Sequence, residues 1–298
     1  MNTILLSGTS NPELASRIAR RLHTKLGDIE ITRFIDNECR VYIKEQVEGK
    51  MVVVVQSLST IADQHLVELC LIGQALKSLK ARHVIAVIPW LGYSKQDKEF
   101  RKGEAISAQL VAKFIEAAGF DAVITVELHS ENVLPFFKIP VSEIRTEELL
   151  RKALKIRPGA VVVSPDKGGK SRSERFANGS GLPIAYLVKK RNLETGEVTV
   201  ADIEGTVKGH DVIIFDDIIN TGATAIRTSQ FLKNHGAKKI YFLATHAVLA
   251  GDAAELFAKS PIDHVIVTDT IAIPKAKLFR KLSLSSVAPF LAGAIKKL

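Results

Sequence analysis

Short apolar runs recur along the chain and alternate with longer amphipathic stretches of about 12 to 20 residues. In the longer stretches apolar residues lie three or four positions apart, as in Leu66, Leu69, Cys70, Gly73 and Leu76, and this spacing predicts helices. Further helices are expected over Glu147–Leu154, Ala225–Leu232 and Val287–Lys297. The apolar runs predict strands at Thr3–Leu6, Met51–Val55, His83–Ile88, Ala122–Val126, Ala160–Val163, Val212–Phe215, Ile240–Ala244 and His264–Val267. The alternation predicts an α/β protein with mainly parallel sheets flanked by helices.

The second part of the chain repeats the first. Val47–Val55, a turn followed by a strand, recurs as Val207–Phe215, and Asp121–Ile124 recurs as Asp263–Ile266, about 140 to 160 residues later. Chance similarity between buried strands explains one such match, but the common order of several matches favours a duplication. We therefore expect two homologous halves that meet near Pro140–Arg145.

Length and composition exclude several classes of protein. A chain of 298 residues predicts two domains. The wholly apolar runs are about five residues long, whereas a membrane helix needs roughly 20, so we expect no membrane span. The first ten residues lack the basic leader and apolar stretch of a secretory signal. Two cysteines are too few for a disulfide framework or a structural zinc site, and we expect a cytoplasmic protein.

The charge balance indicates an acidic partner. The chain has 41 Lys and Arg against 32 Asp and Glu, a net charge of +9. Nucleic acid and a small phosphorylated substrate both fit, and a basic surface with no partner remains an alternative. Aromatic residues make up 6% of the chain and do not interleave with the basic ones, so a stacking platform for single strands is absent. We expect a phosphorylated small molecule and no nucleic acid.

The residues that most clearly indicate a binding site follow the predicted strand Val212–Phe215. Asp216 and Asp217 follow it, and small residues then lead into a helix. A loop of this kind lets backbone N–H groups approach a phosphate at the helix N-terminus, while the carboxylates accept hydrogen bonds from sugar hydroxyls. The alternative is that Asp217 caps the helix. The predicted phosphate loop is Asn220, Thr221, Gly222, Ala223 and Thr224.

At these residues the chain resembles the type I phosphoribosyltransferase fold. More specifically, it resembles ribose-phosphate pyrophosphokinases (phosphoribosyl pyrophosphate synthetases) nearly from end to end. The matching segments, in order, are Asn11–Leu14, Phe34–Glu38, Trp90–Asp97, Val126–His129, Ser164–Asp166, Lys189–Arg191, Ala244–His246, Val267–Thr270 and Ser286–Pro289. The resemblance implies phosphoribosyltransferase-like domains at 1–143 and 144–285, and a C-terminal helix, 286–298, that packs back on the first domain.

The resemblance also implies a reaction. The family transfers a diphosphate from Mg-ATP to the 1-hydroxyl of ribose 5-phosphate, giving 5-phosphoribosyl 1-pyrophosphate and AMP. Lys189 and Arg191 match its catalytic cations, which stabilise the developing charge. His129 and Asp166 match positions that hold Mg²⁺ and the ATP phosphates. By composition alone, the alternative for Lys189 and Arg191 is a solvated charged run.

The ATP side of the site is implied in the same way. Residues 95–104 resemble a mobile loop that closes over the triphosphate and excludes water. In the family an adjoining subunit supplies part of this site, so we expect a homodimer or a larger homo-oligomer with ATP at a subunit interface. For Phe34 the alternative is ordinary strand packing. The matching ATP-binding residues are Phe34, Asp36, Glu38, Lys95, Gln96 and His129.

The chain departs from the family at a few positions. Glu127 stands where Asp is usual and Lys95 where Arg is usual; both keep the charge, but Lys95 loses the planar fork of Arg. Two further functions compete with the synthetase. A phosphoribosyltransferase that consumes the product would share the phosphate loop but have no use for the ATP-side segments. A catalytically silent relative that regulates an active synthetase would not need Lys189, Arg191 and the acid pair together.

Overall fold

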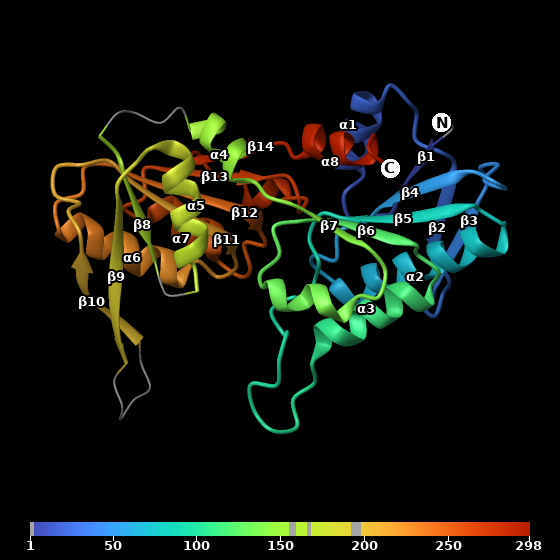
Figure 1. Cartoon of the computed structure of the whole chain (residues 1–298), viewed down its shortest axis with the longest axis horizontal. Helices are drawn as coiled ribbons and strands as arrows, with labels where there is room; N and C mark the ends of the chain where they lie inside the picture. The colour runs from blue at the N-terminus through green and yellow to red at the C-terminus, as the bar shows by residue number, and fades with distance from the viewer. Residues whose placement is uncertain (1–2, 155–158, 166–167, 192–197) are drawn as a thin grey trace. The chain divides into compact units, whose positions relative to one another are not determined.

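Each half of the chain folds around its own sheet in the computed structural model (Figure 1). The structure describes residues 3–154, 159–165, 168–191 and 198–298, with the backbone alone for 189–191 and 198–200. Residues 1–145, 270–272 and 286–298 form a first unit. Residues 146–269 and 273–285 form a second. Within the described ranges, no helix combines the length and apolar character that a membrane crossing requires.

The first unit contains a five-stranded parallel sheet and a separate antiparallel hairpin. In β4 the run Met51–Val55 is buried almost throughout, because strands covered on both faces are apolar on both. The sheet runs in the order β1 (Thr3–Ser7), β4 (Met51–Val55), β5 (His83–Ile88), β6 (Ala122–Val126) and β7 (Val141–Ile144). The hairpin consists of β2 (Ile29–Arg33) and β3 (Cys39–Ile43).

Helices cover both faces of this sheet (Figure 1). On one face α8 (Ala288–Ile295) packs against α1 (Pro12–Leu22). On the other, α2 (Ala62–Ser78) packs against α3 (Ser107–Ala117), and a 3₁₀ helix, η1 (Glu131–Phe136), lies beside α3. The predicted helical spacing around Leu66 is confirmed by α2, whose buried residues include Leu66, Leu69 and Leu76.

The second unit contains a seven-stranded sheet that is parallel except for one edge hairpin. Its order is β10 (Val198–Glu204), β9 (Ile184–Arg191), β8 (Val161–Ser164), β11 (Val212–Ile219), β12 (Ile240–Ala247), β13 (His264–Thr268) and β14 (Leu282–Ser285). Its helices are α4 (Glu147–Leu154), α5 (Lys170–Ser180), α6 (Ala223–Asn234), α7 (Ala253–Lys259) and the 3₁₀ helix η2 (Lys275–Lys277).

Successive residues of β8 enter two different cores. Val162 packs in one cluster with Phe176 of α5, while Val161 and Val163 belong to another that contains Leu232 of α6. Side chains alternate between the faces of a strand, so the sheet is buried on both sides. The α/β class expected from the apolar runs is confirmed.

The predicted duplication is visible in the strand order. Leaving the hairpins aside, β1-β4-β5-β6-β7 of the first unit corresponds to β8-β11-β12-β13-β14 of the second. One hydrogen bond from a backbone N–H to an aspartate occurs at equivalent positions in both units. A carboxylate oxygen of Asp121 accepts a hydrogen bond of 2.7 Å from the backbone N–H of Val84, and Asp263 accepts one of 2.8 Å from Ile240. These aspartates belong to the segments that the sequence comparison had paired.

Candidate functional site

The predicted acid pair lies within a strand and not after it. β11 continues to Ile219, because its pairing with β12 extends past Asp216 to His246 and Ala247. The expectation that the strand ends at Phe215 is therefore wrong by four residues. The side chain of Asp217 is 3% exposed and that of Asp216 is 31% exposed. One carboxylate is thus buried, and its neighbour is accessible to a ligand.

Arg172 holds this pair and was not predicted. It lies on α5, and its Nη1 atom is 3.2 Å from Oδ1 of Asp216 and 3.1 Å from Oδ1 of Asp217. Its side chain is 11% exposed. The backbone N–H of Asp217 also donates to Asp216 Oδ1 at 2.9 Å. These contacts fix the orientation of both carboxylates at the carboxyl end of the sheet.

The predicted phosphate loop joins β11 to α6. Gly222 is the N-cap of α6, with φ +76°, and no side chain caps the helix there. A Cβ at Gly222 would come within 2.4 Å of Cε2 of Phe257, so the backbone conformation and the packing both require glycine. The interpretation of Asp217 as the helix cap is therefore wrong. The first N–H groups of α6 have no capping side chain and can bind an anion.

The rest of this loop is exposed and anchored through its backbone. Asn220, Thr221, Ala223 and Thr224 are exposed. The carbonyl of Asn220 accepts a hydrogen bond of 2.9 Å from the N–H of Ala250. The hydroxyls of Thr221 and Thr224 are further hydrogen-bond donors, in addition to the N–H groups at the start of the helix. The loop can thus bind the phosphate of a sugar phosphate beside the accessible carboxylate of the acid pair.

The predicted catalytic cations belong to β9. The backbone of this strand pairs Lys189 with Val200 and Arg191 with Val198 of β10 in antiparallel register. The sequence interpretation that both cations lie on a strand is confirmed, whereas the positions of their side chains are outside the described part of the chain. Asp166 also lies outside the described residues.

Three predicted ATP-binding residues lie in the turn between β2 and β3. Phe34 is 55% exposed, so the alternative that it is ordinary strand packing is wrong. The turn is closed by a hydrogen bond of 2.9 Å from the N–H of Phe34 to the carbonyl of Glu38. Asp36 Oδ1 accepts a hydrogen bond of 3.2 Å from the N–H of Glu38. An exposed aromatic ring next to two carboxylates can stack on a base and accept from its amino group.

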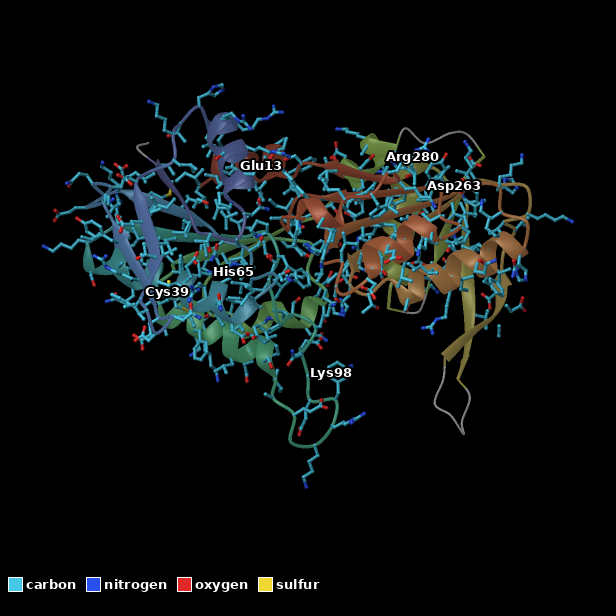
Figure 2. The ribbon with its side chains drawn as sticks, turned by 180° about the vertical axis from the view of Figure 1, so that it is seen from behind. Glu13, Cys39, His65, Lys98, Asp263 and Arg280 are labelled. Carbon is cyan, nitrogen blue, oxygen red and sulfur yellow. The ribbon has the colours of Figure 1, made fainter. Side chains whose placement is uncertain are left out.

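The predicted mobile loop, residues 95–104, connects β5 to α3. Its neck is closed by hydrogen bonds to Gln96: Ser107 Oγ donates to the side-chain oxygen at 2.6 Å and Ala108 N–H to the carbonyl at 3.2 Å. Figure 2 shows Lys98 on the part of the loop that extends away from the neighbouring helices. Gly103 has φ +93° and open space around it. The loop is thus held at Gln96 and exposed beyond it.

His129 follows β6 in a second loop of the same unit. This loop lies beside the neck of the mobile loop, because Asn132 Nδ2 donates to Asp97 Oδ2 at 3.1 Å. Partial burial acts to raise the pKa of Asp97, but hydrogen bonds from Ser130 and Asn132 lower it below its ordinary value. The side chain of His129 is exposed. The first unit thus brings together two of the predicted ATP-binding segments.

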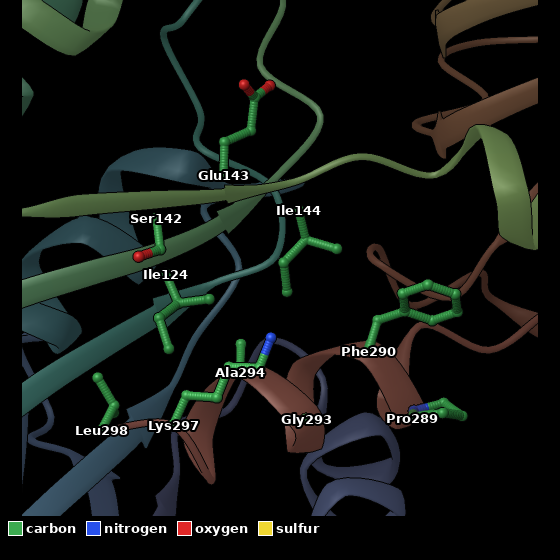
Figure 3. A pocket seen from close by; sticks show the side chains of 10 residues that line it. All are labelled: Ile124, Ser142, Glu143, Ile144, Pro289, Phe290, Gly293, Ala294, Lys297 and Leu298. Atoms are coloured by element: carbon green, nitrogen blue, oxygen red, sulfur yellow. The ribbon is translucent and has the colours of Figure 1, made fainter.

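No predicted site residue lines the hollow beside the C-terminal helix (Figure 3). This hollow has a volume of about 680 Å³ and lies between α8 and the strands β6 and β7. Among the described residues, no group of three or more His, Cys, Asp or Glu side chains could hold a metal ion.

Comparison with known proteins adds an independent finding. A family model described as the N-terminal domain of ribose phosphate pyrophosphokinase matches residues 3–119. A second, described as the phosphoribosyl synthetase-associated domain, matches residues 192–298. The two matches lie in different halves of the duplicated chain.

Similar proteins match along the whole chain. The ribose-phosphate pyrophosphokinase of Caldanaerobacter subterraneus subsp. tengcongensis is 39% identical over 297 residues, covering 99% of this chain and 94% of that protein. The enzyme of the same description from Aquifex aeolicus is 38% identical and covers 99% and 95%. The crystal structure of phosphoribosylpyrophosphate synthetase from Mycobacterium smegmatis superimposes with a TM-score of 0.93 at 34% identity, covering 99% of this chain and 98% of that one.

Proposed function

The chain belongs to the ribose-phosphate pyrophosphokinase family, and we propose which of its residues carry the reaction. It is an enzyme that transfers the diphosphate group of ATP to the 1-hydroxyl of ribose 5-phosphate. The products are 5-phosphoribosyl 1-pyrophosphate and AMP, which feed nucleotide biosynthesis. The observation that carries the site assignment is the exposed, glycine-capped loop beside the Asp216–Asp217 pair.

Ribose 5-phosphate binds at this loop. Its phosphate takes hydrogen bonds from the first N–H groups of α6 and from the hydroxyls of Thr221 and Thr224. Asp216, the accessible carboxylate, accepts hydrogen bonds from the ribose hydroxyls, and the buried Asp217 orients it through their common contact with Arg172. A carboxylate has about four lone-pair sites, so the contact with Arg172 leaves room on Asp216 for a sugar hydroxyl. Asn220, Gly222 and Ala223 complete the loop.

The reaction makes one bond and breaks one. The 1-hydroxyl oxygen attacks the β-phosphorus of ATP, and the bond from that phosphorus to the oxygen bridging it to the α-phosphorus breaks. AMP leaves with the bridging oxygen, and the hydroxyl proton is lost to water. Lys189 and Arg191 stabilise the charge that develops on the transferred and leaving groups. Both residues lie on β9, which pairs with β8. Their position on one strand supports a common role in stabilising this charge.

ATP binds through residues of the first unit. Phe34 stacks on adenine, Asp36 and Glu38 accept from its amino group, and Lys95, Gln96 and His129 contact the phosphates. Asp166 and His129 would be the protein contacts of Mg²⁺, which would supply positive charge beside the ATP phosphates. The exposure of Phe34 supports its assignment as the residue that stacks on adenine.

We also propose an oligomeric state, a cellular location and domain bounds for the enzyme. We infer a homo-oligomer in which the hairpin carrying Phe34 completes a neighbouring ATP site, because Phe34 is 55% exposed in its own chain. We place the enzyme in the cytoplasm, where its two free cysteines stay reduced. The two structural units support a division into 1–143, 144–285 and a C-terminal helix at 286–298.

The assignment of the catalytic cations is tested by a matched pair of variants. Lys189→Ala should lower kcat by about 10²–10³, as removal of one transition-state donor does elsewhere. Lys190→Ala removes the same charge from the adjacent position of β9 and should leave kcat within threefold. Equal losses in the two variants would contradict the role of Lys189.

A further inference from the structure

We propose that Glu143 is a positioning residue for His129. Glu143 lies on β7 and holds the backbone of the loop that presents His129. Nothing in the reaction needs Glu143 to touch a substrate. The inference rests on the proposed function only in that His129 contacts the ATP phosphates there.

The central contact is a hydrogen bond beside His129. The backbone N–H of Leu128 donates to Oε1 of Glu143 at 2.7 Å. This distance is at the short end of the range for an N–H···O hydrogen bond. Leu128 is the residue immediately before His129, so the bond fixes the peptide from which the imidazole projects.

The same loop contains an unfavourable backbone conformation. Glu127 has φ +39° and is buried, although it has a side chain that disfavours the left-handed region. Its N–H donates to the carbonyl of Ile144 at 2.9 Å. Such a conformation persists only where neighbouring contacts hold it. Glu143 and Ile144, adjacent on β7, provide these contacts to two successive peptides.

Glu143 is among the residues that line the hollow beside α8, but its carboxylate contacts the His129 loop. Figure 3 shows its carboxylate directed away from the hollow, whereas Ser142 and Ile144 lie on the opposite side of the strand. Among the ion pairs of the described residues, none includes Glu143. Its negative charge is therefore not matched by a salt bridge in this part of the structure, and its short hydrogen bond is to the His129 loop.

The far side of the loop is held independently. Ser130 Oγ accepts a hydrogen bond of 3.2 Å from the N–H of Asn132, and Asn132 in turn donates to Asp97 at the neck of the mobile loop. With Glu143 removed, the loop stays attached at this side but can relax at Leu128. The expected consequence is a displaced His129, not an unfolded unit.

The experiment compares Glu143→Ala with Glu116→Ala in the full-length enzyme. Glu116 is the matched control because its carboxylate also accepts hydrogen bonds from backbone N–H groups, including that of Ile139 at 3.4 Å, in a loop without a proposed site residue. The readouts are the kinetic constants for both substrates and the imidazole signals of ¹³C-labelled histidine in ligand-free protein, with the His129 signal assigned from His129→Ala.

Glu143→Ala should shift the His129 signal, lower kcat/KM for ATP about tenfold and leave KM for ribose 5-phosphate within twofold. Glu143→Gln keeps an acceptor oxygen and should recover part of the loss. Glu116→Ala should change neither readout. In a His129→Ala background, Glu143→Ala should cause no further loss, because residues acting through one another are not additive.

Two results would overturn the inference: an unmoved His129 signal in Glu143→Ala, or losses that multiply in the double variant. If His129→Ala alone leaves the ATP kinetics unchanged, the role of His129 in the proposed function fails. The shift of the His129 signal still decides whether Glu143 positions it.

Discussion

Nη1 of Arg172 lies 3.1 Å from Oδ1 of Asp217, joining helix α5 to the strand that carries the acid pair. The two residues are 45 positions apart in the sequence and both are largely buried. β8, which precedes α5, is the direct neighbour of β11. The strand order therefore brings a cation to the site that no local motif indicates.

Arg172→Ala should lower the free energy of unfolding by about 3 kcal/mol, because it leaves a buried carboxylate without its cation. Lys152→Ala, on helix α4, breaks an exposed pair with Glu148, whose side chain is 57% exposed, and should cost about 1 kcal/mol or less. Urea denaturation of both variants measures the difference. Equal losses would show that the Arg172 contact is no stronger than a surface pair.

Gly222→Ala should raise KM for ribose 5-phosphate at least tenfold. The added Cβ meets Phe257 at 2.4 Å and the backbone has φ +76°, so the start of α6 must move. Gly209→Ala is the control, since Gly209 has φ +78° but no atom within 4 Å of the added Cβ. Steady-state kinetics should show a normal KM for Gly209→Ala. A raised KM in both would mean that backbone strain alone, anywhere in the unit, disturbs binding.

Phe34→Ala should raise KM for ATP by about 5- to 150-fold, since stacking of a base on an aromatic ring is worth about 1–3 kcal/mol. The ring is 55% exposed, so the free energy of unfolding should change by no more than about 0.5 kcal/mol. Tyr42→Ala removes an aromatic ring of 52% exposure from the same hairpin and should leave KM for ATP unchanged. An equal effect of Tyr42→Ala would remove the case for stacking at Phe34.

Cys70 should react slowly with a thiol reagent in the native protein at pH 8. Burial raises the pKa of its thiol to about 11, so only about 0.1% is thiolate at that pH. Burial also raises the pKa of Cys39 above its ordinary value. Reaction with Ellman's reagent, with and without denaturant, measures the rates, and Cys70→Ala identifies the slowest phase. Native rates equal to denatured ones would contradict the burial of Cys70.

The fully apolar strands were predictable and the half-buried ones were not. Met51–Val55 and His83–Ile88 match β4 and β5 to the residue, because central parallel strands are apolar on both faces. The edge strands β7 and β14 were missed, since each is short and carries polar residues on a partly exposed face. The helix expected from Ala225 begins at Ala223, immediately after its cap at Gly222.

For the candidate site, local motifs could be predicted from the sequence, whereas contacts between residues far apart in the sequence could not. Asp216 to Thr224 could be proposed as a phosphate loop from the sequence, because the acid pair, the glycine cap and the helix start are contiguous. Arg172 and Glu143 could not, because each contacts its partner through the order of neighbouring strands. The roles of Lys189 and Arg191 stay predictions.

The enzyme transfers the diphosphate group through attack at the β-phosphorus of ATP, and phosphorus NMR of the products distinguishes this reaction from transfer of the γ-phosphoryl group. Purified protein is incubated with Mg-ATP, with and without ribose 5-phosphate. We expect AMP and a sugar C1 diphosphate to appear together, and only when both substrates are present. ADP without a sugar diphosphate, or unchanged ATP when both substrates are bound, would contradict it.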